Sequence, residues 1–155
     1  MNKLKLNFLE LKTFTEQDAL DYCQLNSINP EDITELYLND NELTDISGVK
    51  LFKNLKELYL NYNKLKNILV LKDLINLEGL FISCNNIKNI SVINSLINLK
   101  QLSINELESE SDQIKYINSC KNLEDLSCYK GFKDMNITDK LNKNIDINDI
   151  PYIYK

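Results

Sequence analysis

The side chains best suited to chemistry in this sequence are aromatic rings and carboxylates that recur at a fixed interval. Tyr37, Tyr59 and Phe81 follow one another at steps of 22 residues, and a glutamate stands two positions before each tyrosine. Aromatic anchors bordered by polar groups are typical of the centre of a protein-binding surface. We therefore predict that this set binds a protein partner. Its members are Tyr37, Tyr59, Phe81, Tyr62, Glu35, Glu57 and Asp40.

Catalysis is the alternative against which these residue types must be weighed. The sequence contains no histidine, so Ser-His and Cys-His nucleophile pairs cannot form within the chain. Its three glycines are too far apart for a phosphate-binding loop. Glu35 and Glu57 are expected on an open surface, and Cys84 has no neighbouring histidine or arginine to lower its thiol pKa. We predict no enzyme activity, no metal site and no cofactor.

A sequence repeat positions these side chains, because eight positions recur in three successive segments of 22 residues. These positions are Ile33, Leu36, Leu38, Asn41, Leu43, Ile46, Val49 and Phe52 in the first segment, Leu55, Leu58, Leu60, Asn63, Leu65, Ile68, Leu71 and Leu74 in the second, and Leu77, Leu80, Ile82, Asn85, Ile87, Ile90, Ile93 and Leu96 in the third. The alternation at the start of each segment predicts a short strand. The later spacing of three predicts 3-10 or irregular turns.

This pattern resembles the leucine-rich repeat, specifically the 22-residue class found in internalins and in a protein-phosphatase regulatory subunit. The resemblance covers about residues 33–130. It implies an α/β fold, a right-handed solenoid with a short parallel sheet on its concave face and a 3-10 or irregular convex side. Residues 1–155 would then form a single domain with an N-terminal cap over 1–32, about five repeats over 33–130 and a C-terminal cap over 131–155.

The outward positions of the strands should form columns across the concave face, about 4.8 Å apart. Tyr37, Tyr59 and Phe81 would then make one aromatic stripe, although such neighbours can also serve only to stabilise the sheet. Gly79 beside Phe81 predicts a shallow notch. The repeated asparagines at the strand ends are expected to bond to turn backbone as scaffold rather than to contact a ligand.

The fourth unit departs from the repeat. Leu107 replaces the asparagine, and the next unit begins at Leu123 after 24 residues rather than 22. We predict a kink or bulged loop over 106–113. The acidic stretch 106–112 either reaches a basic partner or is a solvated loop, and the second interpretation is favoured.

Both ends need caps, because an open solenoid would expose its core. Thr15 precedes acidic residues as a helix N-cap does, which predicts a helix over 16–25 that covers the first repeat. A strand is expected within 4–11 before it. The C-terminal cap is expected to be irregular, with a short helix near 138–143.

Charge and composition narrow the choice of partner. The net charge is −5, and all 18 basic residues are lysine, which argues against nucleic acid and favours a protein with a basic surface. No segment approaches the roughly 18 apolar residues of a membrane span, and no signal-peptide core is present. We therefore expect no membrane partner, a cytoplasmic location and a monomer when unbound. Four irregularly spaced cysteines predict reduced, mostly buried thiols.

The main hypothesis from the sequence is a non-enzymatic recognition module whose activity is binding itself. One version is an inhibitor or immunity protein that masks a basic toxin, motivated by small size, acidity and a composition rich in Asn, Lys and Ile. An adaptor like the phosphatase regulators is an alternative, and so is a structural or self-associating subunit of a larger assembly. Surface adhesion of the internalin kind would require an export signal.

Overall fold

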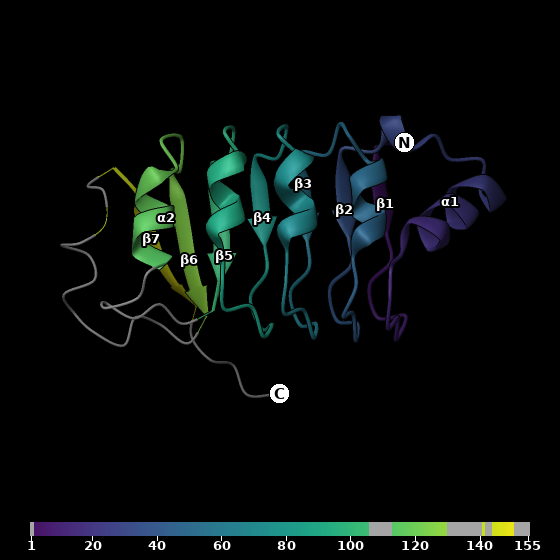
Figure 1. Cartoon of the computed structure of the whole chain (residues 1–155), viewed down its shortest axis with the longest axis horizontal. Helices are drawn as coiled ribbons and strands as arrows, with labels where there is room; N and C mark the ends of the chain where they lie inside the picture. The colour runs from purple at the N-terminus through teal and green to yellow at the C-terminus, as the bar shows by residue number, and fades with distance from the viewer. Residues whose placement is uncertain (1, 106–112, 130–140, 142–143, 151–155) are drawn as a thin grey trace.

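Short strands alternate with short helices in the computed structural model, which describes residues 2–105, 113–129, 141 and 144–150 (Figure 1). The strands are β1 (Lys3–Lys5), β2 (Glu35–Tyr37), β3 (Glu57–Tyr59), β4 (Gly79–Phe81), β5 (Gln101–Ile104), β6 (Asp125–Tyr129) and β7 (Asp146–Ile150). The helices are α1 (Glu16–Leu25), α2 (Gln113–Ser119) and the 3-10 helices η1 (Pro30–Asp32), η2 (Ser47–Leu51), η3 (Leu69–Asp73) and η4 (Ser91–Ser95).

All seven strands form one parallel sheet whose order in space is their order in the sequence. Figure 1 shows the strands standing side by side in a row, with one helical segment beside most of them. The register pairs residues one repeat apart, so that Tyr37 lies beside Tyr59 and Tyr59 beside Phe81. The strands are parallel because the chain returns through the helical side between each strand and the next. The predicted α/β leucine-rich-repeat architecture is confirmed.

The core lies between the sheet and the 3-10 helices. Every second strand residue points inward, and Leu36, Leu58, Leu80 and Leu102 lie beside one another in successive strands with almost no exposed surface. Full burial of one leucine contributes about 1.5–3 kcal/mol relative to exposure. Because each of these leucines is covered by those of its neighbouring strands, the repeats stabilise one another.

The three 3-10 helices of the regular repeats begin in the same way. The side-chain Oδ1 atoms of Asp45, Asn67 and Asn89 accept hydrogen bonds from the backbone N–H two residues later, at 2.7, 2.7 and 2.8 Å. This turn chemistry orients the chain into each short helix. The fourth repeat differs, because α2 is an α-helix with Ile114 and Ile117 buried. The expectation of a 3-10 or irregular convex side was wrong here, and the two extra residues of this repeat provide the length for an α-helical turn.

The N-terminal helix α1 has the predicted limits and the predicted cap. Thr15 Oγ1 accepts a hydrogen bond from Asp18 N at 3.2 Å, and Asp18 Oδ2 accepts one from Thr15 N at 2.7 Å. Hydrogen bonds from the Thr15 backbone and then from its side chain to the Asp18 carboxyl lower the pKa of that group. The strand expected within 4–11 is shorter than predicted: β1 ends at Lys5, and the chain then turns with a positive φ of 57° at Phe8.

The C-terminal region contains an element that the sequence analysis missed. Strand β7 extends the sheet beyond β6, with Ile145 buried before it and Ile147 partly buried within it. The expectation of an irregular cap was wrong for residues 146–150. The helix predicted near 138–143 lies outside the described residues except for Leu141, and so does the loop predicted over 106–113 except for Gln113.

Buried asparagines form a ladder through the turns that follow the strands. Asn63 Nδ2 donates to the carbonyl oxygens of Leu38 and Leu60 at 2.9 and 3.0 Å, and its Oδ1 accepts from Leu43 N at 3.0 Å. The same pattern holds at Asn41 and Asn85. Each amide therefore joins its own turn to the turn of the preceding unit, which confirms the predicted scaffold role.

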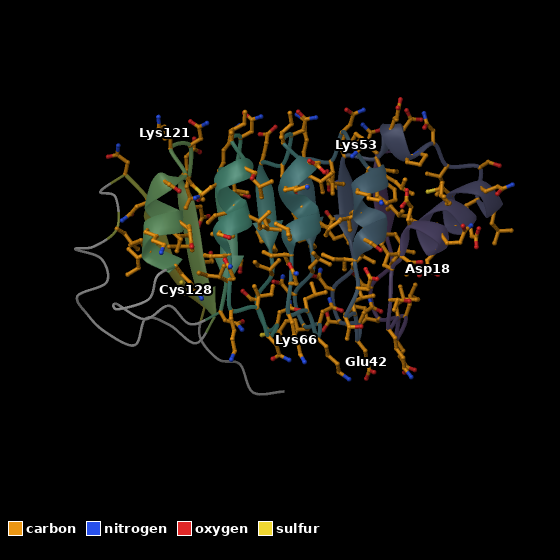
Figure 2. All side chains as sticks on the ribbon, in the orientation of Figure 1. Asp18, Glu42, Lys53, Lys66, Lys121 and Cys128 are labelled. Atoms are coloured by element: carbon orange, nitrogen blue, oxygen red, sulfur yellow. The ribbon has the colours of Figure 1, made fainter. Side chains whose placement is uncertain are left out.

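An exposed asparagine ladder runs along the opposite rim, before the strands. The Nδ2 atom of each member donates to a backbone carbonyl of the preceding repeat, at 2.8–3.0 Å; the members are Asn54, Asn76, Asn98 and Asn122. Charged side chains occupy both rims, with Lys53 and Lys121 at this one and Glu42 and Lys66 at the other (Figure 2). Among the described residues, no helix is long and apolar enough to span a bilayer.

Candidate protein-binding face

The aromatic stripe predicted from the sequence is a continuous stack of three rings on the outer face of the sheet. The ring centroids of Tyr37 and Tyr59 are 4.3 Å apart with an interplanar angle of 4°, and those of Tyr59 and Phe81 are 4.5 Å apart with an angle of 3°. Each ring is partly exposed. Strand pairing sets this spacing, because neighbouring strands lie about 4.8 Å apart. The stack is a rigid, preformed apolar ridge.

The glutamates hold the two tyrosine rings in place. Tyr37 Oη donates to Glu35 Oε2 at 2.7 Å, and Tyr59 Oη donates to Glu57 Oε2 at 2.5 Å. Both pairs form because residues two apart on a strand point to the same face. The predicted carboxylates therefore do border the stripe, and they fix the direction in which the rings lie.

These hydrogen bonds and partial burial shift the pKa values of side chains on this face. Burial and the bond to Glu57 raise the pKa of Tyr59, and the bond to Glu35 raises the pKa of Tyr37. The pKa of the Glu35 carboxyl is lowered, first by the bond from Lys3 and then by that from Tyr37. At neutral pH the face consequently presents protonated tyrosines beside an ionised carboxylate.

The notch predicted at Gly79 is filled by the neighbouring aromatic ring. A Cβ atom at Gly79 would lie 3.1 Å from Phe81 Cε2, and Gly79 is itself buried. The third repeat thus replaces the Glu–Tyr pair with a Gly–Phe pair. A phenylalanine has no hydroxyl to donate, so the missing carboxylate leaves no unpaired group, and the ring leans over the glycine instead. The expectation of an open notch was wrong.

Two other predicted site residues lie beyond the strands. Asp40 and Tyr62 occupy equivalent positions in the turns after β2 and β3, with positive φ values of 53° and 57°. Cys84 occupies the same position after β4, with a φ of 57°. Tyr62 is 48% exposed, which makes it the most exposed aromatic ring of the regular repeats that are described. It lies at the rim of the face rather than within the stack.

Two lysines that the sequence analysis did not include lie on the same face. β1 pairs with β2, so Lys3 lies beside Glu35 and Lys5 beside Tyr37. Lys3 Nζ forms an ion pair with Glu35 Oε2 at 2.8 Å, and Lys5 Nζ lies 5.5 Å from the Tyr37 ring centroid. The aromatic stack therefore has a cation at its N-terminal end. The face changes in charge from β1, which is basic, to Asp125 in β6 and Asp146 in β7, which are acidic.

Comparison with known proteins gives the family of this repeat. The sequence matches the family model of leucine-rich repeats (two copies) over residues 32–73. The solved structure of an internalin (inlF) from Listeria monocytogenes matches with a TM-score of 0.62 and 28% identity, over 77% of this chain and 35% of that one. A leucine-rich-repeat protein from Leptospira interrogans matches with a TM-score of 0.69 and 26% identity, over 97% of this chain and 38% of that one.

The chain is a leucine-rich-repeat protein.

This leucine-rich-repeat chain spans little more than a third of the length of those two relatives. An internalin C2 (inlC2) from Listeria monocytogenes, at 18% identity and a TM-score of 0.63, covers 98% of this chain and is itself covered to 74%; it shows the shared fold alone. No curated protein sequence matches the chain. The leucine-rich-repeat fold is that of a protein-interaction module, and proteins of this kind are generally not enzymes.

Burial limits the reactivity of three of the four thiols in this leucine-rich-repeat protein. Its four cysteines all lie in the described part and form no disulfide, and Cys23, Cys120 and Cys128 are buried, as predicted. Burial raises the pKa of the Cys23 thiol and raises that of Cys120 to about 11, so these groups stay protonated at neutral pH. The described residues contain no cluster of three or more potential metal ligands.

The raised tyrosine pKa values predict that the leucine-rich-repeat fold is sensitive to alkali through Tyr37 and Tyr59. The unfolded chain releases tyrosine protons near pH 10, whereas the folded chain keeps these two. Their contribution to stability is therefore fully present below about pH 10 and is lost as the pH rises toward the folded pKa values. We expect the melting temperature of the wild type to fall more steeply between pH 9.5 and 11 than that of Tyr37→Phe/Tyr59→Phe. Parallel curves by circular dichroism would contradict this assignment.

Proposed function

We propose that the protein binds a protein partner through the outer face of its sheet, without catalysing a reaction. The observation that carries the proposal is the stack of Tyr37, Tyr59 and Phe81, whose rings are half-buried by one another and still face outward. A rigid aromatic surface loses little conformational entropy when a partner covers it. Aromatic side chains are also the residues most often found at the energetic centre of interfaces.

The charges around the aromatic stack support a partner that places a basic group over the middle of the stack. Glu35 is already paired with Lys3, whereas Glu57 has no ion-pair partner within 4 Å among the described residues. The Glu57 carboxylate accepts one hydrogen bond, from Tyr59, and has further lone pairs that can accept others. A lysine or arginine of the partner beside Phe81 would reach this carboxylate and the ring face together. The net charge of −5 favours the approach of such a partner.

Removal of the Tyr59 and Phe81 rings should abolish this binding. We expect Tyr59→Ala/Phe81→Ala to weaken partner binding by about 100-fold or more, since a hot-spot residue contributes about 2 kcal/mol or more. The partner is first captured on the immobilised wild-type chain and identified by mass spectrometry. Its purified form is then titrated against wild type and variant by calorimetry.

A matched variant on the other side of the molecule separates recognition from nonspecific adhesion. Leu69→Ala/Ile97→Ala removes two apolar side chains that lie outside the sheet and are more exposed than the rings, at 59% and 64%. It should bind the partner as the wild type does. Equal loss in both variants would point to nonspecific apolar contact, and unchanged binding by Tyr59→Ala/Phe81→Ala would overturn the proposal.

The structural alternative makes a different prediction for the chain alone. A subunit that self-associates through this face would form a dimer that Tyr59→Ala/Phe81→Ala converts to monomer, and light scattering detects that change directly. A monomer at all accessible concentrations supports a face that is open to a different protein. Inhibition of a toxin, an adaptor role like that of phosphatase regulators and a cytoplasmic location stay predictions from the sequence.

A further inference from the structure

The N-terminal edge of the sheet presents backbone groups that pair with no strand among the described residues. Glu35 N donates to Asn2 O at 3.0 Å, and Leu6 N donates to Tyr37 O at 2.8 Å, so the backbone groups of residues 2, 4 and 6 are directed at β2. Successive residues of a strand direct their backbone groups to opposite sides. The N–H and C=O groups of Lys3 and Lys5 are therefore directed away from β2, at the outer edge of the sheet.

A groove of about 800 Å³ adjoins this edge. Its lining comes from β1 and from the segment between α1 and β2. The residues are Lys3, Leu4 and Lys5 from β1, and Tyr22, Asn26, Ser27, Ile28, Asn29, Asp32 and Ile33 from the end of α1 and the chain that follows it. Leu4 and Ile33 are buried, while Tyr22 and Ile28 are partly buried and pack against the core. Figure 1 shows α1 at this end of the row of strands, beyond β1. The groove thus combines an unpaired strand edge with an apolar lining.

We propose that this groove binds an extended segment of a partner protein, which adds to β1 as a further parallel strand, with an apolar residue beside Leu4 and acidic residues beside Lys3 and Lys5. Backbone hydrogen bonds to a sheet edge supply affinity in such strand addition, and alternating side chains supply specificity. The side of β1 that already pairs with β2 shows which side chains fit beside this strand. There the segment Glu35–Tyr37 places a leucine beside Leu4 and a carboxylate 2.8 Å from Lys3 Nζ.

Lys3 and Lys5 determine which kind of segment can pair with the β1 edge. Lysines on an edge strand oppose pairing with basic segments and with a second apolar edge. An acidic segment reverses this effect, because its carboxylates meet Lys3 and Lys5 in the arrangement that Glu35 already shows on the other side. Asp32 also lines the groove, and its carboxylate disfavours a further carboxylate close to it.

This inference concerns the strand edge next to the aromatic stack rather than Tyr59 and Phe81 themselves, and the two proposals can be tested separately. The probe is a fluorescein-labelled peptide, Ser-Thr-Glu-Leu-Glu-Leu-Ser, measured by fluorescence anisotropy with the full chain at low salt. We expect it to bind at least tenfold more tightly than the same peptide with lysine in place of glutamate. Lys3→Glu/Lys5→Glu should reverse that order. Tyr59→Ala/Phe81→Ala should bind the acidic peptide as the wild type does, so failure of the proposed function would leave this result unchanged.

Backbone methylation of the peptide tests strand addition itself. In the parallel orientation the N–H groups of the peptide leucines face β1 and those of its glutamates face away. N-methylation of the leucines should therefore weaken binding about tenfold or more, since each methyl group removes one backbone hydrogen bond to β1, while N-methylation of the glutamates should have little effect. Equal effects at all positions, or no binding at millimolar peptide, would overturn the proposal. Concentration-dependent oligomers that the peptide dissociates would assign the edge to a second copy of the chain instead.

Discussion

Substitution of Asn63 by alanine is expected to lower the free energy of unfolding by about 2–4 kcal/mol. Asn63 is only 8% exposed, and its side chain holds the backbone of two successive repeats together. The carbonyl oxygens of Leu38 and Leu60 would each keep one donor, because Asn41 and Asn85 also bond to them. The N–H of Leu43 would lose the side-chain acceptor that Asn63 provides. A buried group without a partner costs about 1–3 kcal/mol, and the lost bonds to the two carbonyls add to this cost.

The exposed asparagine ladder provides the matched control for this prediction. Asn76 Nδ2 also donates to a backbone carbonyl, that of Lys53, at 3.0 Å, but the contact is exposed to solvent. Water can replace that donor, so Asn76→Ala should cost less than about 1 kcal/mol. Urea unfolding followed by circular dichroism measures both variants against the wild type. Equal decreases in the free energy of unfolding of the two variants would show that the burial of Asn63 is not what makes it important for stability.

The repeats could be predicted from the sequence because their signals are local and occur several times. The limits of α1 follow from the cap at Thr15, and the inward leucines follow from alternation within each short strand. The buried ladder at Asn41, Asn63 and Asn85 was also predictable, since an asparagine at every strand end implies one shared structural purpose. Each of these predictions depends on residues within one repeat and on its copies at the same spacing.

The N-terminal strand was harder to predict, because its match to the repeat occurs at a different spacing. Leu4 and Leu6 correspond to Leu36 and Leu38 at an offset of 32 residues rather than 22. The offset is longer because the ten-residue helix α1 occupies the place of a 3-10 helix. A search at variable spacing would have placed this expected strand in register with β2, and with it the two lysines that change the charge of the face.

The C-terminal strand and the bonds within the aromatic stack were missed for other reasons. Residues 145–147 alternate between buried and outward positions, but the same short pattern also fits irregular structure, and it occurs only once. The hydrogen bond from Tyr59 to Glu57 depends on side-chain rotamers, which the sequence pattern does not specify. The filling of the Gly79 position by Phe81 likewise depends on the direction in which that ring leans. Sequence spacing predicted which residues share the face but not which of them contact one another.

Substitution of Gly48 by alanine is expected to separate the N-terminal cap from the repeats and to cost about 3 kcal/mol. A Cβ atom at Gly48 would lie 2.8 Å from the carbonyl oxygen of Phe14 and closer still to that of Thr15, and both of these are backbone atoms. Gly48 N also donates to Phe14 O at 2.8 Å, so the two segments cannot move apart without losing this bond. Overpacking of a tight contact usually costs about 1–3 kcal/mol, and the lost bond adds to it.

Gly79, the other described glycine, provides the control. It separates the effect of a clash with backbone atoms from the general effect of replacing glycine by alanine. At Gly79 the added Cβ atom would meet only side-chain atoms of Phe81 and Glu57, which can rotate away. Gly79→Ala should therefore change stability by less than about 1 kcal/mol, since alanine also restricts the unfolded chain more than glycine does. Thermal unfolding ranks the two variants, and hydrogen exchange should show faster exchange of the α1 amides in Gly48→Ala alone. If Gly48→Ala melted like the wild type, or if α1 stayed equally protected, the close packing of η2 against Thr15 would not be what fixes the cap.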